Sequence, residues 1–117
     1  MIRKDGYYIS EVFSWVDWHA GHKFEEKKFY LLKFLTTENV IRASNKSNKI
    51  TATIFQDRMN YVDNYLLLDD KTLEITLNPQ SKWSVKRQFT IVSPEILLDE
   101  DLKEYRFVPS TPASASL

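Results

Sequence analysis

Apolar residues recur at every second position along much of this chain, and this alternation constrains the fold more than any other feature. The clearest run covers residues 72–78. Leu73, Ile75 and Leu77 share one parity there, while threonine, glutamate and asparagine hold the other. Side chains of a β-strand point alternately to opposite faces, whereas a helix would scatter these three residues around its axis. The run therefore predicts a strand with one buried face.

Several other runs show the same alternation or have the composition of strands. Run 51–55 is rich in β-branched residues, and run 29–35 is apolar on both parities, which predicts a strand covered on both faces. Turn-forming residues separate the runs at the spacing of a barrel or sandwich. We therefore predict an all-β chain that forms a small antiparallel meander barrel or curled sheet of about eight strands. The bulky residues of two further alternating runs are Tyr7, Ile9, Phe13 and Trp15, and Trp83, Val85, Phe89 and Ile91.

Two segments lack this alternation. Residues 16–28 combine Gly21 with a cluster of charged side chains, which predicts a long loop with room for one helical turn. Residues 110–117 are rich in proline, serine and alanine, the composition of a flexible tail. The chain shows no internal repeat. We expect a single barrel domain over 1–109 and a flexible C-terminal tail over 110–117.

The charge balance and the absence of cysteine exclude several classes of protein. Sixteen basic and sixteen acidic side chains cancel, which argues against a nucleic-acid partner and against a polybasic membrane anchor. No apolar run approaches the roughly 20 residues that span a bilayer. The first residues are charged, unlike a signal peptide, and the chain has no cysteine for disulfides. We expect a cytoplasmic protein that contacts neither membrane nor nucleic acid.

Residues 16–28 hold the local cluster that most suggests chemistry. Asp17, His19 and His22 are ligand types that suit zinc, but the spacing of the two histidines chelates a metal only on a helical turn, and Gly21 interrupts it. A solvated loop explains the cluster better. The sequence has no cysteine nucleophile, no glycine-rich phosphate loop and no Gly-x-Ser-x-Gly elbow. We expect no enzyme activity, no metal and no cofactor.

Four charged residues share a parity with bulky neighbours and would point into the barrel. They are Glu11, Arg42, Asp63 and Arg87. Burying a charge is costly unless it is paired or hydrogen-bonded. One hypothesis is that Arg42 or Arg87 meets the carboxylate or phosphate of a ligand. The other is that the two acids and two bases pair with each other, or that a different register exposes them.

The order of the predicted elements resembles that of the small bacterial lipocalin-like (calycin) domains. The residues that carry the resemblance are Gly6-Tyr7-Tyr8, Tyr30-Leu31-Leu32-Lys33-Phe34, Val40-Ile41, Tyr65 with Leu67, Ile96-Leu97-Leu98 and Tyr105-Arg106-Phe107-Val108-Pro109. It covers roughly residues 6–109 and departs from the family pattern at Asn39, where a glycine is usual. The resemblance implies a lipocalin-like meander barrel, and larger relatives carry apolar ligands in the barrel mouth.

Two functions of different class fit these observations. The first is a non-catalytic module that binds a small apolar or amphipathic ligand in the open end of the barrel. The second is a protein-interaction or structural domain with a filled barrel, which uses residues 16–28 or an exposed edge strand to meet a partner or a copy of itself. An open cavity favours the first, and close packing favours the second. The candidate ligand-binding residues are Tyr30, Phe34, Tyr65, Trp83, Arg87 and Tyr105.

Overall fold

The structure is built from antiparallel strands joined by turns and loops. The computed structural model describes residues 2–11, 13–35, 38–45, 55 and 60–109. The predicted tail 110–117 and residues 51–54 of one predicted strand lie outside this described part. The strands are β1 (Gly6–Ser10), β2 (Phe13–His19), β3 (His22–Phe34), β4 (Asn39–Asn45), β5 (Tyr61–Leu67), β6 (Thr72–Leu77), β7 (Val85–Ser93), β8 (Ile96–Leu98) and β9 (Glu104–Pro109).

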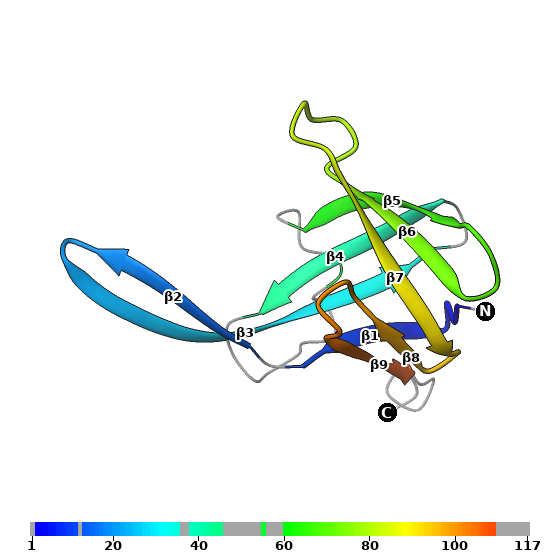
Figure 1. Ribbon diagram of the computed structural model, residues 1–117, viewed down its shortest axis with the longest axis horizontal. Coiled ribbons are helices and arrows are strands. Elements are labelled where there is room, and N and C mark those ends of the chain that lie inside the picture. Colours follow the sequence, from blue (N-terminus) through cyan, green and yellow to red (C-terminus); the bar gives the residue numbers. More distant parts are fainter. Residues whose placement is uncertain (1, 12, 36–37, 46–54, 56–59, 110–117) are drawn as a thin grey trace.

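Eight of these strands close into an antiparallel barrel. From β3 to β9 each strand pairs with the next one along the chain, as in a meander. Strand β1 then pairs with β9 on one side and with β3 on the other, which closes the sheet on itself (Figure 1). The predicted all-β barrel is therefore confirmed. Closure leaves β2 outside the barrel, paired only with the first half of β3.

Residues 29–34 of β3 contribute to apolar clusters on both faces, as the sequence of run 29–35 predicted. Leu32 and Phe34 point into the barrel and belong to the main core, where they are 2% and 1% exposed. Phe29 and Leu31 point the other way and form a second cluster on the outer face of the barrel. Phe55 packs against that second cluster. A strand with apolar residues on both parities is thus covered by two separate layers.

The first strand is buried on both faces too, and its orientation corrects a prediction. Tyr7 and Ile9 do share a face, but it is the outer one, where they pack with Phe55. Tyr8 points into the barrel and is fully buried. The ring centroids of Tyr7 and Phe55 lie 5.4 Å apart, so bulky side chains on this strand do not mark the barrel interior. Glu11 has the same parity as Tyr7 and Ile9, so it does not point into the core, and it is exposed.

The long loop predicted for residues 16–28 is wrong. This segment forms a β-hairpin in which His19 pairs with His22 across a turn of two residues, Ala20 and Gly21. Their φ angles are 51° and 80°, both in the left-handed region that such hairpin turns require. The hairpin projects from the barrel as an arm made of β2 and residues 22–28 of β3 (Figure 1).

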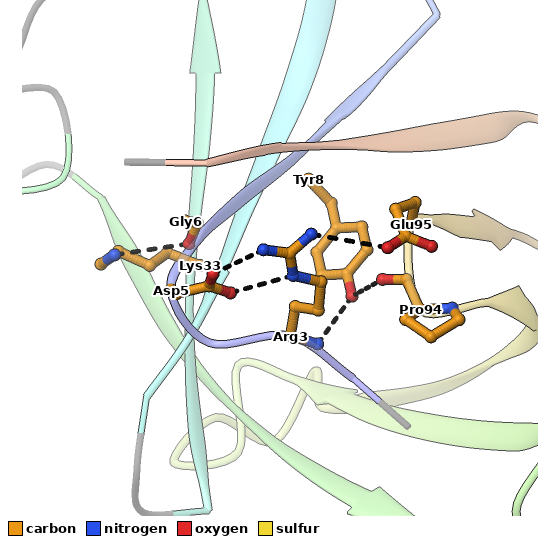
Figure 2. A network of polar contacts seen from close by, with 7 residues as sticks. All are labelled: Arg3, Asp5, Gly6, Tyr8, Lys33, Pro94 and Glu95. Atoms are coloured by element: carbon orange, nitrogen blue, oxygen red, sulfur yellow. Dashed lines mark hydrogen bonds and ion pairs between the residues drawn. The ribbon is translucent and has the colours of Figure 1, made fainter. Parts of the chain in front are cut away.

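The N-terminal segment closes one end of the barrel. Ile2 is 7% exposed and belongs to the core. The backbone N–H of Arg3 donates to the Tyr8 hydroxyl over 2.9 Å, and this hydroxyl donates to the Pro94 carbonyl over 2.6 Å (Figure 2). The Arg3 guanidinium lies 4.1 Å from the centre of the Phe107 ring. Tyr8 thus joins the N-terminal segment to the turn between β7 and β8.

Replacing Tyr8→Phe tests this connection. The variant removes the donor to the Pro94 carbonyl and the acceptor for Arg3, so we expect a loss of about 1–3 kcal/mol in the free energy of unfolding. Tyr7→Phe is the matched control, because burial alone shifts the pKa of the Tyr7 phenol and no hydrogen bond contributes to that shift. Urea unfolding of both variants measures the difference. Equal stability of the two would contradict the assigned role of Tyr8.

Candidate ligand-binding site

A cleft of about 520 Å³ opens at the end of the barrel opposite the N-terminal segment. Its inner wall is formed by Tyr30, Leu32, Ile75, Leu77, Phe89 and Tyr105. Its charged groups are Arg42, Arg87, Asp99, Glu100, Asp101 and Lys103. The strands place these residues because alternate positions share a face: Tyr30 precedes Leu32 on the inner face of β3, and Leu77 follows Ile75 on that of β6.

The inner wall of the cleft is apolar and fixed by packing. Ile75 and Leu32 are 0% and 2% exposed, so they form the floor. Phe89 and Tyr105 pack edge-to-face, with ring centroids 5.4 Å apart and an angle of 76° between the planes. Edge-to-face contacts of this kind hold both rings in one orientation. The wall can therefore receive an apolar group without rearranging.

Tyr105 also brings a polar atom to this wall. Burial, which has the largest effect, and the nearby Asp99 carboxylate both raise the pKa of the Tyr105 phenol well above its ordinary value. The hydroxyl therefore stays neutral at physiological pH and can donate a hydrogen bond. The residue lines the cleft, so this hydroxyl can donate to a molecule there.

Beneath the cleft lies a buried ion pair. The Nε of Arg42 donates to Oδ2 of Asp63 over 2.7 Å, and Asp63 is fully buried. The other carboxylate oxygen of Asp63 accepts the backbone N–H of Asn78 over 3.0 Å. The Arg42 guanidinium also stacks over the Tyr61 ring, 4.4 Å from its centre. Two of the four charged residues predicted to point inward, Arg42 and Asp63, thus pair with each other, and neither needs a ligand to neutralise its charge.

The loop between β8 and β9 forms the charged rim. Oδ1 of Asp99 accepts the backbone N–H groups of Asp101 and Lys103, over 2.9 Å and 2.8 Å. Leu102 has a φ of 62°, which completes this tight turn. Across the cleft, Arg87 reaches Glu100 over 3.5 Å, and both side chains are at least half exposed. The rim is therefore a backbone loop held by hydrogen bonds that carries exposed charges.

The structure brings together three of the six predicted ligand-binding residues. Tyr30, Arg87 and Tyr105 line the cleft. Phe34 and Tyr65 lie at the closed end, where their rings pack edge-to-face with centroids 4.9 Å apart. Trp83 precedes β7 in the loop after β6; it is 73% exposed, with the Lys82 ammonium 5.4 Å from its ring. These three residues do not line the cleft.

Sequence reasoning missed the floor and the rim of the cleft. Ile75 and Leu77 could have been predicted as lining residues, because both lie on the inward face of their strand. The rim residues 99–101 could not have been predicted, since a solvated acidic turn and the acidic rim of a cleft have the same composition. Only the packing of β8 and β9 beside β7 brings that turn to the barrel mouth.

The histidines of the arm do not form part of this site. His19 and His22 face each other across the two-residue turn. Within the part of the chain that the structure describes, no three histidine, cysteine or acidic side chains converge as metal ligands would. Nor does that part contain a helix long and apolar enough to cross a membrane. The chain matches no family model, no curated protein and no solved structure.

The buried ion pair and the rim ion pair make a matched test. Arg42→Met leaves Asp63 charged, buried and without its partner, so we expect a loss of about 3–5 kcal/mol in the free energy of unfolding. Arg87→Met removes only an exposed pair and should change that free energy by about 1 kcal/mol or less. Denaturant unfolding of both variants measures this. A small effect of Arg42→Met would contradict the burial of the pair.

The buried tyrosines predict a loss of stability at alkaline pH. The unfolded chain releases the Tyr105 proton near pH 10, whereas the folded protein holds it to higher pH. Stability is therefore unaffected by this group below about pH 10 and falls as the pH rises further. Tyr105→Phe should make that fall shallower. Burial also raises the pKa values of Tyr7 and Tyr8, so part of the fall remains.

Urea unfolding curves at neutral pH and above pH 10 measure this difference. Equal slopes for wild type and Tyr105→Phe would show that the Tyr105 phenol is solvated in the folded protein.

Proposed function

We propose that this protein binds a small amphipathic molecule in the cleft at the open end of the barrel, without catalysing a reaction. One observation carries the proposal: the cleft has an apolar wall at its floor and charged groups at its mouth. An amphipathic molecule would place its apolar part against Ile75 and Phe89. Its polar group would then lie at the level of the rim.

The size of the cleft supports this reading. Small-molecule sites commonly enclose about 300–1,000 Å³ and combine apolar walls with a few polar groups that fix orientation. The volume of about 520 Å³ falls within that range. Here the orienting groups are the Tyr105 hydroxyl inside the cleft and Arg87 at its edge. A barrel filled by its own side chains would leave no such volume at this end.

The residues at the cleft support binding better than catalysis. Its described lining contains no serine, cysteine or histidine, so it lacks the usual nucleophiles and the usual base at neutral pH. The Arg42 guanidinium is already neutralised by Asp63. The relationship to lipocalin-like domains forms part of the same proposal, and the closed antiparallel barrel supports it.

Filling the cleft provides the test. Leu77→Trp places an indole in the cleft, whereas Leu66→Trp adds the same side chain on β5 at a position that is 57% exposed and outside the cleft. The fluorescent amphiphile 1-anilinonaphthalene-8-sulfonate serves as the probe. We expect wild type and Leu66→Trp to bind it alike, and Leu77→Trp to bind it at least about tenfold more weakly, a loss of about 1.4 kcal/mol.

Equal binding of the probe by all three proteins would contradict the proposal. A second measurement addresses natural cargo: native mass spectrometry of gently purified protein, compared with its denatured mass. We expect an added mass on wild type and on Leu66→Trp that denaturation releases. The same added mass on Leu77→Trp would place the cargo elsewhere and overturn the assignment to the cleft.

A further inference from the structure

The arm exposes two strand edges that the barrel does not. Every barrel strand has a neighbour on each side, whereas β2 pairs only with β3 among the residues that the structure describes. Residues 22–28 of β3 likewise pair only with β2 within the described part of the chain. A two-stranded hairpin is marginally stable in water by itself, and a wider sheet stabilises it.

The two edges differ in the residues that protect them. Natural edge strands avoid association by carrying charges, especially lysine, or proline. Residues 22–28 of β3 hold five charged side chains: Lys23, Glu25, Glu26, Lys27 and Lys28. Strand β2 holds one, Asp17, and neither lysine nor proline. It also exposes Val16 and Trp18, at 46% and 67%. The β3 edge is protected, and the β2 edge is not.

The register of the hairpin shows which backbone groups of β2 face outward. A two-residue turn closes on a hydrogen-bonded pair, here His19 with His22. Hydrogen-bonded and non-hydrogen-bonded pairs alternate along an antiparallel ladder. The backbone N–H and C=O of Asp17 therefore face β3, and those of Val16 face the outer edge. Val16 thus offers both a donor and an acceptor to an incoming strand.

We propose that β2 pairs antiparallel with β2 of a second copy of this chain, about a twofold axis at Val16. The two Val16 residues then face each other as a hydrogen-bonded pair, which gives one continuous sheet across both arms. In this register Asp17 lies opposite Trp15 of the second copy, so no like charges face each other. This inference concerns the arm and does not depend on the cleft.

Two properties of the chain favour a second copy over a different protein. Antiparallel pairing about a twofold axis covers the unprotected edge of both molecules at once and leaves none for further growth. The formal net charge of zero removes the long-range repulsion that keeps strongly charged molecules apart. The edge of β2 is therefore complementary to itself in backbone hydrogen bonding, and the proposed register brings no like charges face to face.

A charge-swap experiment tests the twofold axis directly. Sedimentation velocity of wild type over a wide concentration range should show a dimer that grows with concentration. Val16→Lys or Val16→Glu alone should give monomers, because two like charges would face each other across the axis. Mixing the two variants should restore a dimer that contains one of each. Only a register that places residue 16 opposite residue 16 predicts this rescue.

Val62→Lys is the matched control, since Val62 is a valine of similar exposure, 56%, on the barrel strand β5. It should leave the dimer intact, and circular dichroism melts verify that every variant stays folded. A wild-type monomer at all concentrations would overturn the proposal. So would a dimer that survives Val16→Lys, or variants that dissociate singly and fail to associate when mixed.

Discussion

Closure of the barrel depends on β1, the one strand that pairs with both ends of the meander. A side chain at Gly6 would collide with the Val108 carbonyl and approach the Phe107 ring to 2.7 Å, so β1 and β9 meet this closely only with glycine there. Two positions later, Tyr8 fills the barrel and holds the N-terminal segment. Without this strand β3 and β9 would both be open edges. The position of β1 therefore determines where the core, the closed end and the cleft lie.

The two ends of the barrel differ in what fills them. At the end near the N-terminus, aromatic rings pack on one another: Tyr8 lies 5.6 Å from Phe34 and 5.2 Å from Phe107, between ring centroids. At the other end the interior holds Arg42 and Asp63. A buried carboxylate must keep its partner, and the guanidinium that satisfies it occupies a place that an apolar side chain would otherwise fill. The polar pair and the open cleft therefore occur together.

Local alternation predicted the strands of the barrel, because each has a face against the core. It predicted a strand through Phe13 and Trp15 but not the hairpin of the arm, because Gly21 and the charged side chains of residues 16–28 indicated a loop. Alternation also could not show which of the inward-pointing residues line the cleft. Tyr30 and Phe34 share a strand and a parity, yet one lines the cleft and the other lies in the closed end. That difference arises from the N-terminal segment and the loop after β8, which approach the barrel from distant parts of the sequence.

The positions of the charged residues carry information that the net charge does not. Equal numbers of acidic and basic groups argue against a nucleic-acid partner, but they say nothing about which strand edges are protected. Along the arm, residues 22–28 of β3 include five charged residues, whereas the paired strand β2 has one. Solubility alone would favour charge on both strands. The proposed pairing of β2 with a second copy accounts for this difference, because it requires an edge without repelling charges.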